Sequence, residues 1–97
     1  MKYKIDVVRI RENSITLNGW VVGKNPESEP SFQVEDASHR PVAIQYVPTR
    51  RDDVSQIYYK EIHDKDFGFD IQFPYERGND YWLVIRCDGK TVREKYN

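Results

Sequence analysis

The stretch Phe67–Phe73 (FGFDIQF) decides the fold class of this chain. Its four large apolar residues alternate with Gly68, Asp70 and Gln72 without a break. Alternation of this kind is the period of a β-strand that buries one face and exposes the other. The stretch is therefore predicted to be a strand whose apolar face belongs to the core.

The segment that follows predicts a central strand and a hairpin. Tyr81–Cys87 is apolar on both faces until Arg86, which is typical of a strand inside a sheet. Asp88-Gly89 is a strong signal for a two-residue hairpin turn. Lys90–Lys95 then returns as a short strand whose alternating charges suit an exposed sheet edge.

Four further runs of β-branched and aromatic residues, bounded by turn residues, predict strands upstream. They span Lys4–Arg11, Ile15–Gly23, Ser31–Glu35 and Val42–Val47. Gly19 interrupts the second run, and a glycine inside a strand often marks a bulge. We expect this bulge to turn Trp20 inward. In the fourth run, Tyr46 is expected on the apolar face.

The segment between the fourth and fifth predicted strands reads as a short helix. Val54, Ile57 and Tyr58 recur at helical spacing. Asp52 is a good N-cap candidate, because its carboxylate can accept a hydrogen bond from an orphan backbone N–H of the first turn. We therefore expect one or two helical turns over Asp53–Tyr59, crossing between two sheets.

Seven strands and one short helical crossover favour an all-β fold of two packed antiparallel sheets, with a small barrel as the alternative. A length of 97 residues is that of one domain. Residues 1–97 are accordingly expected to form a single sandwich with a thin core.

The composition limits which partners and which cellular compartment are expected for the chain. The chain has 15 basic and 16 acidic residues, so it carries no strong field that would attract nucleic acid or an acidic membrane. Met1–Arg11 lacks the apolar stretch of a signal peptide, so we expect a cytoplasmic protein that does not insert into a membrane. Cys87 is the lone cysteine, which excludes an internal disulfide and suggests a small buried residue.

Candidate chemistry is sparse. The dense group His63-Asp64-Lys65-Asp66 matches no closed zinc or calcium spacing, and it is expected to be a solvated loop. A Cys–His pair would need Cys87 to meet His39 or His63, although a residue inside a strand is an unusual nucleophile. We therefore expect no catalytic residue, metal or cofactor, and no enzyme activity of the chain by itself.

Binding is the easier function to place. Exposed aromatic side chains offer large rigid contact areas to sugars and proteins. The candidates are Trp82, Tyr59, Tyr58 and Tyr75, and beside them Tyr81. Trp82 and Tyr59 lead, because each falls off the apolar face of its predicted element. Each of these rings would otherwise belong to the core.

Four short motifs recur in an order that resembles a known domain. They are LNGWV at residues 17–21, FQVED at 32–36, RDDV at 51–54 and GFDI at 68–71. As an ordered set, they resemble an immunoglobulin-like β-sandwich domain found beside the catalytic domain in family 2 glycosyltransferases of Gram-positive bacteria. The resemblance covers nearly the whole chain, and the order and spacing of the motifs carry it.

The residues of these motifs suit structural roles. Arg51 would pair with a carboxylate, Asp53 would cap the helix and Val54 would enter the core. Gly68 would allow another backbone to approach closely, while Phe69 would fill the space between the sheets. Gly19 and Trp20 complete the set of recurring positions.

The resemblance implies that the chain is an accessory domain without catalytic activity of its own. The transferase chemistry would belong to an attached catalytic domain, of which this chain would be an N-terminal neighbour within a larger protein. The chain would position the enzyme, an acceptor glycan of the cell wall or a partner. Three other readings stay open: a carbohydrate-binding module, a protein-interaction sandwich that pairs through an edge strand, and a small enzyme.

Overall fold

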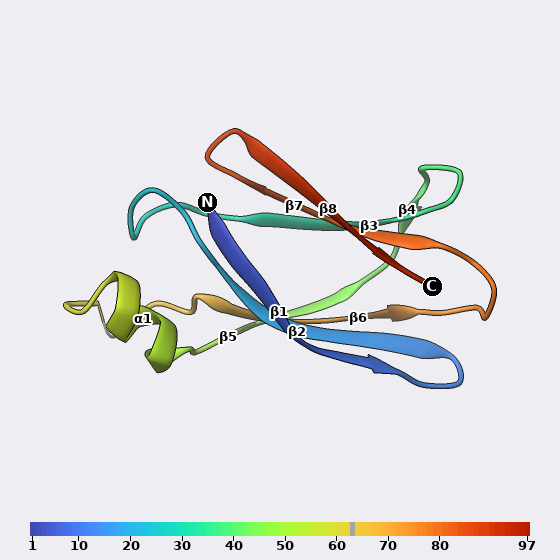
Figure 1. Cartoon of the computed structure of the whole chain (residues 1–97), viewed down its shortest axis with the longest axis horizontal. Helices are drawn as coiled ribbons and strands as arrows, with labels where there is room; N and C mark the ends of the chain where they lie inside the picture. The colour runs from blue at the N-terminus through green and yellow to red at the C-terminus, as the bar shows by residue number, and fades with distance from the viewer. Residues whose placement is uncertain (63) are drawn as a thin grey trace.

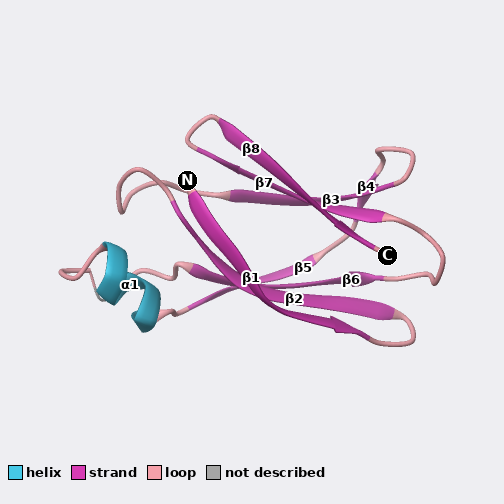
Figure 2. Cartoon of the chain, viewed as in Figure 1, coloured by secondary structure: helices cyan, strands magenta, loops and turns pink. Residues whose placement is uncertain are grey.

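The computed structural model describes residues 1–62 and 64–97. Two antiparallel four-stranded sheets pack face to face, and a short helix lies at one end of the sandwich (Figures 1 and 2). The elements are β1 Lys2–Ile10, β2 Ser14–Val22, β3 Ser31–Asp36, β4 Pro41–Val42, β5 Gln45–Thr49, α1 Asp52–Tyr58, β6 Gly68–Pro74, β7 Tyr81–Cys87 and β8 Lys90–Tyr96.

The strand order is that of an immunoglobulin-like sandwich. One sheet has the order β1-β2-β6-β5 and the other β4-β3-β7-β8. These orders correspond to strands ABED and C′CFG of the immunoglobulin fold. The backbone N–H of Glu76 donates a hydrogen bond to the Tyr81 hydroxyl at 3.0 Å, where this fold has its tyrosine corner. The predicted fold class is thus confirmed.

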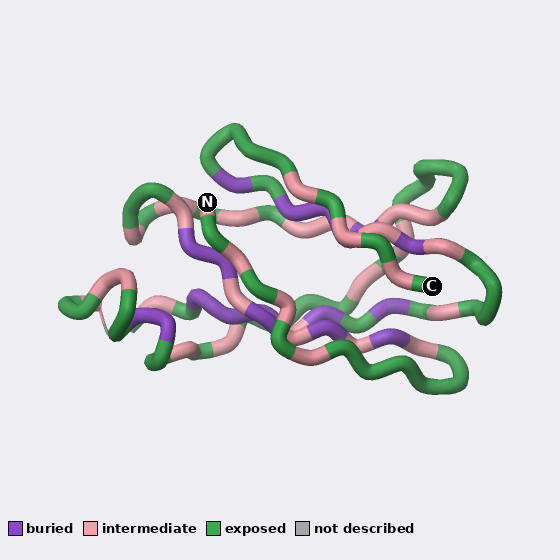
Figure 3. Tube along the Cα trace, viewed as in Figure 1, coloured by how far each residue is buried: buried purple, intermediate pink, exposed green. Residues whose placement is uncertain are grey.

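The core lies where the alternation of Phe67–Phe73 predicts it. Phe69, Ile71 and Phe73 point inward from β6 and are at most 1% exposed. β7 contributes Leu83 and Ile85 from the opposite sheet, both fully buried. Figure 3 shows the buried segments concentrated in the central strands, while the hairpin tips are exposed. The hairpin at Asp88-Gly89 also forms, with both residues at positive φ.

The fourth predicted strand is in fact two strands. β4 ends at Val42 and β5 begins at Gln45, and the chain passes from one sheet to the other between them. The described residues therefore form eight strands rather than the predicted seven. Strands in both sheets alternate with the same period of two, so the pattern carries no mark of the passage.

The helix forms as expected, but its start and its connection differ from the prediction. Arg51 occupies the N-cap position without a side-chain hydrogen bond that caps the helix, and the first turn contains Asp52 and Asp53. The expectations that Asp52 or Asp53 caps the helix are therefore wrong. Both carboxylates instead pair with the arginines that precede them. The helix joins β5 to β6, which are neighbours in one sheet, so it does not cross between the sheets.

Gly19 acts through a close approach rather than through a bulge of its own strand. A Cβ atom at Gly19 would lie 2.1 Å from the carbonyl oxygen of Lys4 and 2.8 Å from the Phe69 ring. The bulge is in β1, where Asp6 is the extra residue opposite Gly19 and its neighbour. β2 keeps its alternation, so Trp20 is not turned inward as expected. It packs on the far side, with its ring 5.6 Å from that of Tyr58.

Replacing Gly19 by alanine should destabilise the fold by about 1–3 kcal/mol, because the added methyl group overlaps the neighbouring backbone and the Phe69 ring. Chemical denaturation of Gly19→Ala measures this loss. Thr16→Ser, three residues away on the opposite face of β2, should stay within about 0.5 kcal/mol. Equal stability of Gly19→Ala and the unchanged chain would contradict the close approach.

Candidate binding sites

The solvent-facing side of β3, β7 and β8 carries a cluster that we call the Trp82 platform: Trp82, Glu35, His39, Arg93 and Lys95. Trp82 lies in the central strand β7, directly between Glu35 of β3 and Lys95 of β8. The charged groups of Arg93 and Lys95 lie 5.8 and 5.7 Å from the centre of its ring. The His39 ring lies 6.4 Å away on the other flank. An aromatic face is thereby surrounded by hydrogen-bonding groups.

The platform offers both an acceptor and donors. The Glu35 side chain is only 13% exposed, and its Oε1 lies 2.9 Å from Nη1 of Arg93. This ion pair lacks hydrogen-bond geometry, so Oε1 has no hydrogen-bond partner among the described residues. Lys95 Nζ lies 3.6 Å from an oxygen of Asp80. Arg93 and Lys95 are themselves 40% and 52% exposed, and ion pairs of such solvated cations are weak, so their charged ends can exchange partners.

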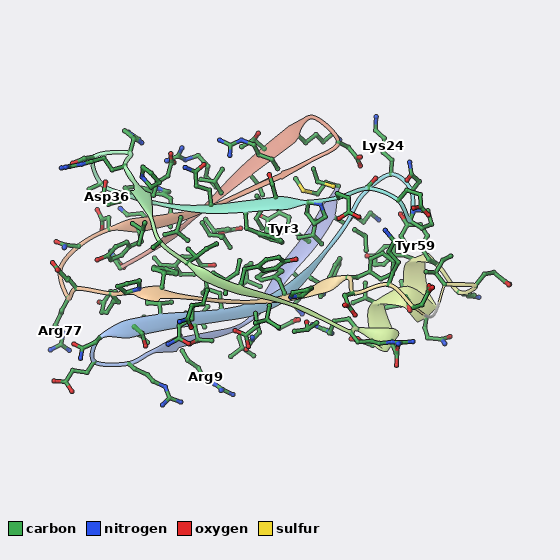
Figure 4. The ribbon with its side chains drawn as sticks, turned by 180° about the vertical axis from the view of Figure 1, so that it is seen from behind. Tyr3, Arg9, Lys24, Asp36, Tyr59 and Arg77 are labelled. Atoms are coloured by element: carbon green, nitrogen blue, oxygen red, sulfur yellow. The ribbon has the colours of Figure 1, made fainter. Side chains whose placement is uncertain are left out.

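Tyr58 and Tyr59 lie together at the end of α1, away from the platform. Both pack on a small second cluster of buried side chains formed by Val22, Val54 and Phe67. The Tyr59 hydroxyl donates a hydrogen bond of 2.7 Å to the carbonyl oxygen of Gly23. Figure 4 shows Tyr59 between the helix and the loop that follows β2. Its ring therefore ties that loop to the helix.

Tyr75 lies at a third place, after β6. Its ring centre is 5.9 Å from that of Tyr81, and its backbone N–H donates to the carbonyl oxygen of Asn13 at 3.0 Å. The four candidate aromatics thus occupy three separate places in the fold. Their role in ligand binding stays a prediction, and Trp82 is the one set among groups that suit a ligand.

A groove beside the edge strand β5 was missed by sequence reasoning. We call it the β5 groove. It has a volume of about 540 Å³ and is lined by Tyr46 and Pro48 of β5, by Val21, Phe32 and Phe67 at its base, and by residues 26–30, 62 and 64–66. Tyr46 does face the core side, but it is 45% exposed, because β4 is too short to cover it. Burial, followed by the charges of Glu29 and Asp66, raises the pKa of Tyr46.

No catalytic or metal centre emerges from the described part of the chain. Its His, Cys, Asp and Glu side chains form no group of three that would hold a metal ion. Cys87 is 3% exposed and faces the core, roughly 16 Å along β7 from the Trp82 flank where His39 lies. His63, the other histidine considered above, lies outside the described residues.

The positions that carry the resemblance have structural contacts. Arg51 donates to both oxygens of Asp53, at 2.9 and 2.8 Å, and to Asp6 in the β1 bulge at 2.6 Å. Val54 is buried in the second cluster. A Cβ atom at Gly68 would lie 2.2 Å from Oγ1 and 3.0 Å from the backbone carbonyl oxygen of Thr49 in β5, and 2.6 Å from Cγ of Arg51, so Gly68 makes room for the β5 backbone and for this arginine. The predicted ion pair of Arg51 and the close approach at Gly68 are confirmed.

Comparison of the chain with protein-family models, with curated proteins and with solved structures gives no significant match. The likeness to a glycosyltransferase accessory domain therefore rests on the four motifs. Among the described residues, no helix has the length and apolar character needed to cross a membrane.

The ion pair of Arg51 with Asp53 should contribute to the pH dependence of the stability at acid pH. The hydrogen bond from Arg51 lowers the pKa of Asp53 from its ordinary value of 3.8 to about 2 in the folded chain. The stabilisation is complete above the unfolded pKa and is lost as the pH falls from about 4 to about 2. Urea unfolding of Arg51→Gln should show a flatter pH dependence across this interval, whereas Arg50→Gln should not. A slope unchanged by Arg51→Gln would contradict this role.

The thiol of Cys87 should be inert in the folded chain. Burial, followed by the nearby charge of Asp88, raises its pKa above the ordinary value of 9.0. Because the thiolate is the reactive form, iodoacetamide at neutral pH should modify the native chain far more slowly than the chain in urea. Mass spectrometry follows the reaction, and equal rates in the two states would contradict the buried placement.

Proposed function

We propose that this chain is a non-catalytic accessory domain of a bacterial glycosyltransferase, and that it holds an acceptor glycan on the Trp82 platform. The order of the four motifs supports the first half of the proposal. The second half is supported by one observation: an aromatic ring in the middle of a solvent-facing sheet lies between a carboxylate and two cations.

The physical chemistry of this surface suits a sugar. A pyranose ring presents C–H groups on its face, which pack on the indole, and hydroxyl groups at its rim. Glu35 Oε1 has no hydrogen-bond partner among the described residues but is buried beside Arg93, so it would accept a bond from such a hydroxyl group once the Arg93 side chain turns away. Arg93 and Lys95 attract the Trp82 ring by only about 0.5–1 kcal/mol, so they can turn toward the oxygens of a ligand. Their positive charge favours glycans that carry acidic groups.

A carbohydrate-binding module that acts without an attached enzyme would use the same surface. The hypothesis of an accessory domain adds that the nucleotide-sugar, its metal and the transfer step belong to a separate catalytic domain. In this account the chain raises the local concentration of acceptor near that domain, which increases the apparent affinity without a new catalytic contact. The distinction is therefore tested on the attached enzyme and not on the chain alone.

Amide NMR titration of the labelled chain with acidic and neutral cell-wall oligosaccharides tests the binding site. Shifts should cluster on β3, β7 and β8 around Trp82. Trp82→Ala should weaken binding about tenfold, which corresponds to about 1.4 kcal/mol. Lys95→Gln should weaken binding of the acidic oligosaccharides more than that of the neutral ones, because it removes a positive charge.

Tyr59→Phe is the matched control, because it changes an aromatic residue far from the platform and keeps its ring. Its affinity for the oligosaccharides should equal that of the unchanged chain. Thermal unfolding checks that each variant is folded. An absence of shifts at millimolar concentrations of every oligosaccharide, or shifts confined to the helical end, would refute the Trp82 platform as a glycan site.

A further inference from the structure

The edge strands of the two sheets are protected to different degrees. β8 has alternating charges, and β1 carries lysines, Arg9 and the bulge at Asp6. β4 has only two residues and begins with a proline. β5, with the sequence QYVPT, is longer and has no charged side chain. Charges, bulges and short length are the devices that keep edges from pairing with other chains, and in β5 only Pro48 serves this purpose.

β5 also presents apolar side chains to solvent. Tyr46 is 45% and Val47 58% exposed, and the two point to opposite faces of the sheet. In the part of the chain that the structure describes, their outer backbone edge has no neighbouring strand, because β5 ends the order β1-β2-β6-β5. An extended segment laid against Gln45–Val47 would gain main-chain hydrogen bonds and cover both side chains.

The β5 groove supplies charge complementarity to such a segment. Its base is apolar, and its rim carries Glu27, Glu29, Asp64 and Asp66. Lys65 is the one cation among the described residues of this rim, and its Nζ lies 3.5 Å from Glu29 and 4.0 Å from Glu27. These two glutamates are 84% and 85% exposed, so their carboxylates remain hydrated and available. A side chain with an apolar stem and a cationic head matches both the base and the rim.

We propose that β5 accepts an extended basic segment of a partner protein as an added strand, with a lysine or arginine of that segment in the β5 groove. Alternate residues of the segment point toward Tyr46 and the groove, and the residues between them cover Val47. The sequence preference is therefore a basic residue at every second position with β-branched residues between. This surface is separate from the Trp82 platform, so it goes beyond the proposed glycan site and can be tested without any sugar.

Fluorescence anisotropy with the labelled, end-capped peptide TKVRVKT tests the proposal. The peptide should bind, and its affinity should fall as salt is added, since the rim charges become screened. Val47→Lys places a charge on the edge and should weaken binding about tenfold. Glu29→Gln with Asp66→Asn should have a similar effect. Thr91→Lys, which adds the same charge to the exposed edge strand β8, should leave the affinity unchanged.

Two further peptides separate strand addition from simple charge attraction. TKVRVKT with N-methyl groups on alternate backbone nitrogens keeps every charge but loses hydrogen-bond donors, so it should bind much more weakly. TEVEVET should not bind. Equal affinity for the methylated and unmethylated peptides, or equal affinity of Val47→Lys and Thr91→Lys for TKVRVKT, would overturn the proposal. A dimer in sedimentation that Val47→Lys dissolves, without peptide binding, would assign β5 to a second copy and overturn it as well.

Discussion

The ring of Phe69 occupies the space that a side chain on Gly19 would fill, and several features of the fold depend on this contact. It brings β2 close to β6 at the centre of one sheet, where Gly19 and Phe69 are paired. On the other side of Gly19, the β1 backbone approaches as closely, and the register shifts at Asp6. The bulge directs Asp6 toward Arg51, which also binds Asp53 at the start of the helix. One missing side chain in the core is thereby linked to the position of the surface helix.

The two proposed binding surfaces follow from the same topology. The Trp82 platform is the outer side of the sheet that contains β7, whose inner side is filled by Leu83 and Ile85. The β5 groove exists because the chain leaves that sheet after Val42, so a two-residue strand stands opposite a longer one. A ligand on either surface leaves the other uncovered. A glycan and a protein segment would thus be held at once, in keeping with a domain that connects an acceptor with an enzyme.

The extent to which sequence predicts this structure differs between levels. The alternation of Phe67–Phe73, the apolar run Tyr81–Cys87 and the turn at Asp88-Gly89 predict their elements correctly, because burial on one face and positive φ act locally. The predictions of a single strand over Val42–Val47 and of an inward-facing Trp20 were wrong, because both features depend on which distant strand lies alongside. The neighbours of Trp82 come from β3 and β8, so the sequence around Trp82 could not predict them either. The exposure of Tyr46 could have been suspected only from the prolines at positions 41 and 48 that bracket its segment.

The pairing of β2 with β6 also bears on how the chain is made. Leu17 lies opposite Ile71, so the central strand of this sheet waits for a partner 71 − 17 = 54 residues further along. At ribosomal rates of about 5–20 residues per second, that interval lasts roughly 3–10 s. Until then β2 has β1 alone beside it, and the apolar side of this first hairpin remains unpaired. Such non-local pairing is typical of small domains that fold slowly, in milliseconds to seconds, and it leaves the apolar side of the emerging N-terminal hairpin exposed during synthesis.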